Sequence, residues 1–105
     1  MNKLILPLIF ISFFISSAEK DINSEWCLSI GGKEQFRTKD GTYVDCLTDE
    51  YAIEVEYDYK WKEGIGQALH YAESTNKQAA ILFIKRAKSR KDYYNEMMRV
   101  IDKYD

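Results

Sequence analysis

Hydrophobic and polar residues recur along this chain with the two periods of regular structure, two for strands and three to four for helices. Alternation is clearest over residues 51–59, and the continuous apolar run over 79–84 is typical of a strand buried on both faces. Turn-forming residues separate these segments. The predicted elements are, in order, a helix over 21–30, strands over 33–38, 42–47 and 51–59, a helix over 60–74, a strand over 79–84 and a helix over 89–104.

This order predicts an α/β fold with an αβββαβ core, a mixed four-stranded sheet and an extra C-terminal helix. Short hairpin connections make the first three strands antiparallel, and the strand–helix–strand connection makes the last two parallel. Gly64 and Gly66 weaken the helix over 60–74, so we expect them to permit close packing on the sheet. Ser89 is the expected N-cap of the last helix.

Residues 1–18 have the organisation of a signal peptide. Lys3 precedes an almost unbroken apolar run over 4–15, and Ser16-Ser17-Ala18 supplies the small residues of a cleavage site. The run is shorter than the ~20 apolar residues that span a bilayer, although an uncleaved anchor is the alternative. We therefore expect an exported protein, periplasmic or secreted, with one domain over 19–105 and no membrane attachment after cleavage.

Charge limits the partners of this domain. Loss of Lys3 with the signal peptide leaves 14 of the 15 basic residues beside 17 acidic ones, a net charge of −3. Such a domain has no overall field that attracts nucleic acid, so binding would need a local basic patch or metal ions. One such patch follows the predicted last strand, although it is equally typical of a solvated loop. It comprises Lys85, Arg86, Lys88, Arg90 and Lys91.

The chain has two cysteines, Cys27 and Cys46, both after the predicted signal peptide. In an exported protein an even pair most simply forms one disulfide bond. Two buried free thiols are the alternative. A metal site made by these two residues alone is disfavoured because no Cys-x-x-Cys or Cys/His cluster accompanies them.

Carboxylates gather on the second and third predicted strands. Glu54 and Glu56 share a face because side chains two residues apart in a strand point the same way. Asp45 can approach Glu54 across the hairpin. Oxygen ligands that converge in this way suit Mg²⁺ or Mn²⁺, which polarise phosphoryl oxygens. The alternative is an ordinary solvated strand face.

The stretch Asp45…Glu54-Val55-Glu56…Gln67-Ala68-Leu69-His70-Tyr71 within this element order resembles the PD-(D/E)xK nuclease superfamily. More closely, the segments 40–47, 52–56 and 60–69 resemble a set of small exported bacterial proteins of that fold. The resemblance covers roughly residues 26–84. It implies a restriction-endonuclease-like core, and Gln67 and Tyr71 match the Gln-x-x-x-Tyr element of its RecB-like branch.

The resemblance also implies roles for individual side chains. Asp45 and Glu54 match the two metal ligands of the motif. Glu56 stands where most members have the lysine that activates water, and Lys60, just beyond the strand, could return a cation to that place. Glu34 matches an acidic residue that some members place near the metal.

These roles predict an exported metal-dependent nuclease, an endonuclease or exonuclease that hydrolyses nucleic-acid phosphodiesters. Gln67 and Tyr71, four residues apart on one helix face, would support the phosphate. The alternative is a catalytically inactive module of the same fold that binds a protein or nucleic-acid partner outside the cytoplasm. A third interpretation, a disulfide-stabilised structural protein, leaves the carboxylates unexplained. His70 is interpreted as an ordinary helix residue, and nothing in the sequence indicates the oligomeric state.

Overall fold

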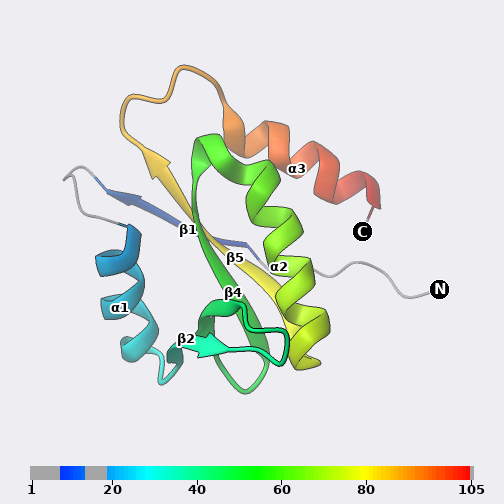
Figure 1. Cartoon of the computed structure of the whole chain (residues 1–105). Helices are drawn as coiled ribbons and strands as arrows, with labels where there is room; N and C mark the ends of the chain where they lie inside the picture. The colour runs from blue at the N-terminus through cyan, green and yellow to red at the C-terminus, as the bar shows by residue number, and fades with distance from the viewer. Residues whose placement is uncertain (1–7, 14–18, 105) are drawn as a thin grey trace.

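A computed structural model of the chain describes residues 8–13 and 19–104, and it describes side chains from Ile22 onward (Figure 1). The strands are β1 (Leu8–Phe13), β2 (Lys33–Arg37), β3 (Tyr43–Leu47), β4 (Tyr51–Tyr57) and β5 (Gln78–Arg86). The helices are α1 (Glu19–Ser29), the short 3-10 helix η1 (Asp58–Lys60), α2 (Trp61–Thr75) and α3 (Tyr93–Tyr104).

The five strands form one mixed sheet in the order β1-β5-β4-β3-β2. Strands β2, β3 and β4 are antiparallel, whereas β4 and β5 are parallel and are joined through α2. The α/β class, the order of elements and the strand directions predicted from the sequence are therefore confirmed. The finer prediction, a restriction-endonuclease-like arrangement, is not shown by this topology.

The fifth strand was not predicted. Strand β1 pairs in parallel with β5, from Leu8 opposite Ile81 to Phe13 opposite Arg86. It comes from the apolar segment interpreted as part of a signal peptide, and the remainder of residues 1–18 lies outside the described residues. The signal peptide itself stays a prediction.

Helices cover both faces of the sheet: α1 lies on one side, and α2 and α3 lie on the other (Figure 1). Two layers of buried side chains result. The layer beneath α2 and α3 contains Trp61, Ala68, Ala79, Ile81, Phe83, Met97 and Ile101. The layer beneath α1 contains Ile22, Cys27, Cys46, Ile53, Val55, Ala80, Leu82 and Ile84.

The disulfide bond between Cys27 and Cys46 fastens α1 to β3, with 5.7 Å between the two Cα atoms. Both cysteines are fully buried. Gly32 lies directly against the bond, because a Cβ atom at this position would fall 2.5 Å from the Cys46 sulfur. The bond therefore fixes the place where the chain leaves α1 and enters β2.

The beginning of α3 differs from the prediction. The helix begins at Tyr93, and the Asp92 carboxylate accepts a hydrogen bond from the Asn95 backbone N–H at 3.1 Å. Asp92 is therefore the N-cap. Ser89 lies before the helix and donates instead to the carboxylate of Asp58. None of the described helices is long and apolar enough to cross a membrane.

Candidate functional site

Asp45 lies where the β3–β4 ladder ends. The ladder pairs Cys46 with Ile53 and Leu47 with Ala52. Beyond these pairs the Asp45 side chain, rather than a backbone carbonyl of β3, accepts a hydrogen bond from β4. The Val55 backbone N–H donates to Asp45 Oδ2 at 2.8 Å. The backbone carbonyl of Asp45 accepts a hydrogen bond from Asn23 Nδ2 at 2.7 Å, so α1 also holds this residue in place.

Glu54 and Glu56 lie on β4 beneath α2, each only 5% exposed. Helix α2 approaches closely because Gly64 faces Glu56, and a Cβ at Gly64 would lie 3.1 Å from Glu56 Cγ. The alternative of a solvated strand face is therefore wrong for these two residues. Burial of a carboxylate is costly unless it is hydrogen-bonded or protonated.

Burial is also the largest influence on the pKa values of this cluster. It raises the pKa of Asp45, although hydrogen bonds from the Val55 N–H and with the Glu54 side chain act in the opposite direction. It raises the pKa of Glu56 as well, against the effects of the Tyr57 N–H and the Lys60 charge. Two carboxyl groups that share a hydrogen bond favour retention of a proton between them.

Tyr71 lies close to the same acidic side chains. Its ring is buried with Val44 and Ala52 between α2 and the sheet. Burial raises the pKa of Tyr71, and the charges of Glu54 and Asp45 raise it further. The structure thus places Asp45 within electrostatic reach of Glu54, Glu56 and Tyr71.

The other predicted site residues lie further out. Glu34 is exposed on β2, opposite Cys46, and Gln67 is exposed on α2. Lys60 is exposed in η1, where its charge lowers the pKa of Glu56 and its Nζ lies 5.7 Å from the centroid of the Tyr59 ring. The core of the predicted site is therefore Asp45 with the β4 carboxylates, and Lys60 stands at its edge.

Among residues whose side chains the structure describes, no group of three or more His, Cys, Asp or Glu could hold a metal ion. Asp45 and Glu54 alone would supply two carboxylate ligands. Their hydrogen bond and the Asp45–Val55 contact already occupy part of this acceptor capacity. The predicted Mg²⁺ or Mn²⁺ site stays a prediction.

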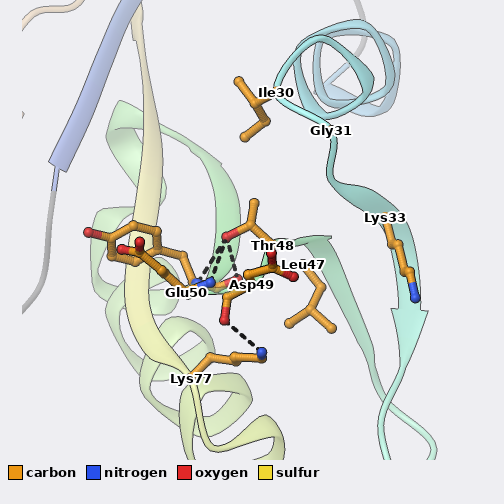
Figure 2. A pocket seen from close by; sticks show the side chains of 9 residues that line it. Ile30, Gly31, Lys33, Leu47, Thr48, Asp49, Glu50 and Lys77 are labelled. Atoms are coloured by element: carbon orange, nitrogen blue, oxygen red, sulfur yellow. Dashed lines mark hydrogen bonds between the residues drawn. The ribbon is translucent and has the colours of Figure 1, made fainter.

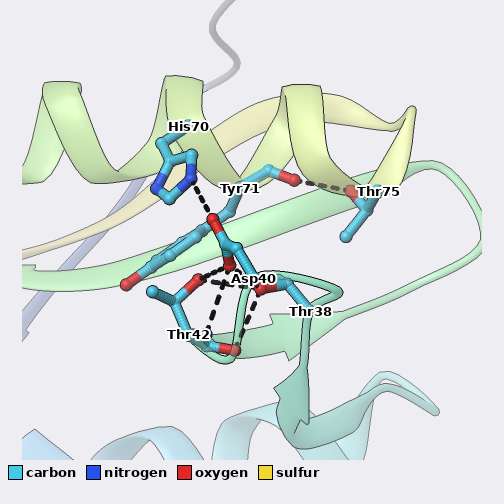
Figure 3. A network of polar contacts seen from close by, with 6 residues as sticks. All are labelled: Thr38, Asp40, Thr42, His70, Tyr71 and Thr75. Carbon is cyan, nitrogen blue, oxygen red and sulfur yellow. Dashed lines mark hydrogen bonds and ion pairs between the residues drawn. The ribbon is translucent and has the colours of Figure 1, made fainter.

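The turn between β2 and β3 is fastened to α2 by a polar network that the sequence did not reveal (Figure 3). His70 Nε2 lies 2.7 Å from Asp40 Oδ2. Asp40 Oδ1 accepts hydrogen bonds from Thr38 Oγ1 and from the hydroxyl of Thr42 at 2.7 Å. These bonds hold the pKa of Asp40 well below its ordinary value. His70 thus contacts a loop 30 residues away.

A hollow of about 470 Å³ lies beside the β3–β4 turn (Figure 2). Lys77 reaches across it, and its Nζ donates to the backbone carbonyl of Asp49 at 2.6 Å. The other residues that line the hollow are Ile30, Gly31, Lys33, Leu47, Thr48, Glu50 and Tyr51. None of the predicted site residues lines this hollow.

The end of β5 and the loop that follows it carry the basic cluster seen in the sequence, and a buried carboxylate binds two residues of this segment. Asp58 is only 1% exposed, and its Oδ1 accepts a hydrogen bond from Arg86 Nε at 2.8 Å. Ser89 donates to the other oxygen of the same carboxylate. We call residues 85–91, the last two residues of β5 and the loop after it, the basic loop. Its remaining cations are exposed, namely Lys85, Lys88, Arg90 and Lys91.

Comparisons with known proteins identify viral relatives. Two KilA-N domain-containing proteins of Acanthamoeba polyphaga mimivirus are 32% and 31% identical to this chain over 90 residues, which is 86% of the chain. A third KilA-N domain-containing protein of that virus is 46% identical over 55 residues, or 52% of the chain and 14% of the relative. The chain matches no family model and no solved structure.

The chain spans 24% and 35% of the length of the first two relatives. Their names refer to a KilA-N domain and to no nuclease, and they come from a virus rather than from bacteria. The predicted membership in the PD-(D/E)xK superfamily is therefore wrong. The nuclease and hydrolase functions that it implied are wrong as well, and so is the alternative of an inactive module of the nuclease fold. These relatives also give no support to the predicted export. The chain is similar, over most of its length, to part of viral KilA-N domain-containing proteins.

Proposed function

We propose that this chain is a nucleic-acid-binding module that contacts the phosphate backbone through the basic loop. The observation that carries this proposal is the concentration of five basic residues within seven positions, in a segment whose Arg86 and Ser89 side chains bind a buried carboxylate. Contacts between cations and phosphates supply most of the affinity of non-specific nucleic-acid binding. The viral relatives are compatible with a nucleic-acid partner.

The interactions of Asp58 make this loop suited to binding. Arg86 neutralises the Asp58 carboxylate, so this acidic group does not oppose an approaching phosphate. Ser89 fixes the middle of the loop to the same carboxylate. A binding surface that is already ordered loses less conformational entropy when a partner arrives. The acidic balance of the whole chain is therefore no obstacle, because the local charge of the loop is positive.

The proposal is tested by fluorescence anisotropy with labelled single-stranded and duplex DNA at salt concentrations from about 50 to 200 mM. The test variant carries Lys88→Gln, Arg90→Gln and Lys91→Gln. We expect its affinity to fall more than tenfold, and the slope of log affinity against log salt to decrease by about 2 to 3.

A matched control variant carries Lys33→Gln, Arg37→Gln and Lys39→Gln, which remove three exposed cations at β2 and its following turn. We expect this control to bind almost as well as the wild type. Equal losses in the two variants would show that only the total charge matters. That result, or the absence of wild-type binding at low salt, would overturn the proposal.

A further inference from the structure

An exposed aromatic ring lies beside the basic loop. Tyr59, in η1 at the end of β4, is 44% exposed. The Arg86 guanidinium carbon lies 4.2 Å from the centroid of the Tyr59 ring. The ring of Tyr57 is stacked with it at 6.1 Å between centroids and 20° between planes. The Tyr57 ring and the Arg86 guanidinium therefore both lie beside the exposed Tyr59 ring.

One oxygen atom holds both the Tyr59 backbone and the Arg86 side chain. Asp58 Oδ1 accepts the backbone N–H of Tyr59 at 2.8 Å and also Arg86 Nε at 2.8 Å. Because Asp58 is buried, the Tyr59 backbone and the Arg86 guanidinium are anchored from within the protein. The Arg86 side chain nevertheless stays 44% exposed. Packing of the hydrophobic core does not account for a large ring and a guanidinium that are held in place and left in contact with solvent.

We propose that Tyr59 and Arg86 form a stacking platform for an unpaired base, so that the module prefers single-stranded nucleic acid. This inference rests on the proposed function. Aromatic rings and guanidinium planes are the groups on which proteins stack unpaired bases. Bases in the interior of a duplex already stack on one another, and they reach such a platform only if the duplex opens. Lys60, whose Nζ lies 5.7 Å from the Tyr59 ring, and the basic loop supply cations for the flanking phosphates.

The experiment compares a single strand of about 16 nucleotides with its blunt duplex, for the wild type and for Tyr59 variants. We expect the wild type to bind the single strand more tightly than the duplex. Tyr59→Ser should lose about tenfold in single-strand affinity with little change for the duplex, because one stacked base is lost. Tyr59→Phe keeps the ring and should bind within about twofold of the wild type.

Two further variants separate stacking from other effects. Tyr59→Leu keeps an apolar side chain without an aromatic face, and it should lose as much affinity as Tyr59→Ser. Tyr43→Ser removes another exposed ring, on β3, and should change nothing. Fluorescence of 2-aminopurine in the strand gives a second readout: the wild type should quench it by stacking, and Tyr59→Leu should not.

Equal binding of the single strand and the duplex by the wild type would overturn the platform. Wild-type affinity of Tyr59→Leu for the single strand would also overturn it. In both cases the proposed function would stand if the basic-loop variant still lost affinity. If the wild type bound neither nucleic acid, the proposed function itself would fail. Thermal unfolding of each variant confirms that it is folded before binding is compared.

Discussion

The carboxylate of Asp45 accepts the backbone N–H of Val55, with 2.8 Å between Oδ2 and N. This side chain thus provides an acceptor for β4 beyond the last residue pairs of the β3–β4 ladder. Val55 is completely buried, so its N–H has no access to bulk water as an alternative partner. Asp45 therefore has a structural role that is independent of any metal ion.

Replacement of Asp45 tests this role. Asp45→Ala leaves a buried N–H without its acceptor, and we expect the free energy of unfolding to fall by about 1–3 kcal/mol. Asp45→Asn keeps a carbonyl oxygen at the same place and should lose clearly less. Urea denaturation near neutral pH measures both values. Equal losses in the two variants would contradict a role as hydrogen-bond acceptor.

The pH dependence of stability tests the burial of Glu56. Burial raises the pKa of Glu56 in the folded protein above its ordinary value of 4.5. At pH values between the ordinary pKa and the raised pKa, the folded state binds more protons than the unfolded state. The free energy of unfolding therefore falls as the pH rises through this window. Above the raised pKa the loss is complete. Asp45, whose pKa is also raised, adds a loss of the same sign.

Glu56→Gln removes the ionisation and keeps the shape of the side chain. We expect this variant to gain stability relative to the wild type as the pH rises from about 4 to neutrality. The measurement is a series of urea midpoints across this range, compared between the two proteins. A difference that stays constant with pH would show that Glu56 titrates normally in the folded state.

Two glycines in α2 provide a matched pair of substitutions. Nothing lies within 4 Å of a Cβ at Gly66, so Gly66→Ala should stabilise the protein by up to about 1 kcal/mol through helix propensity. A Cβ at Gly64 would lie 3.1 Å and 3.2 Å from Cγ and Cβ of Glu56. Because Glu56 is buried beneath the helix, we expect Gly64→Ala to be destabilising.

Thermal and urea unfolding of both variants measure the effect of the same substitution at a buried and at an exposed position of α2. A gain in stability from Gly64→Ala equal to that from Gly66→Ala would mean that α2 does not press on β4 at this point.

The disulfide bond closes a loop with a sequence separation of 19 residues between Cys27 and Cys46. The chain-entropy model assigns about 3 kcal/mol of stability to a loop of this size. The double variant Cys27→Ala/Cys46→Ala should therefore unfold at a distinctly lower urea concentration. Oxidised wild type should respond to a reductant only when unfolding exposes the buried sulfurs. An unchanged urea midpoint in the double variant would contradict a stabilising role of the disulfide bond.

Local patterns predicted the order of the elements because alternation and helical periodicity are properties of neighbouring residues. The shared face of Glu54 and Glu56 follows from the same rule. The same rule does not predict that α2 covers this face, because the approach of α2 depends on the contact between Gly64 and Glu56, which belong to different elements. The contact between Asp58 and Ser89 spans 31 residues, so neighbouring residues do not reveal it, and the prediction of Ser89 as a helix cap is wrong.

The same limitation applies to the candidate sites. The Asp40-Gly41 turn was visible in the sequence, but its contact with His70 was not, because it joins a loop to a helix that folds over it. The carboxylate motif was recognised by spacing alone. Spacing cannot distinguish carboxyl groups that serve a reaction from those that satisfy a neighbouring strand, as the Asp45 carboxylate does for Val55.

The position of β1 at the margin of the sheet has a consequence for a shortened chain. Strand β5 is nine residues long and rich in apolar side chains, and β1 pairs with it over six residue positions. If a peptidase removed residues 1–18, this row of backbone donors and acceptors would lose its partner and become a template for other chains. Strand β1 therefore cannot both be removed with a signal peptide and protect the edge of β5 from self-association.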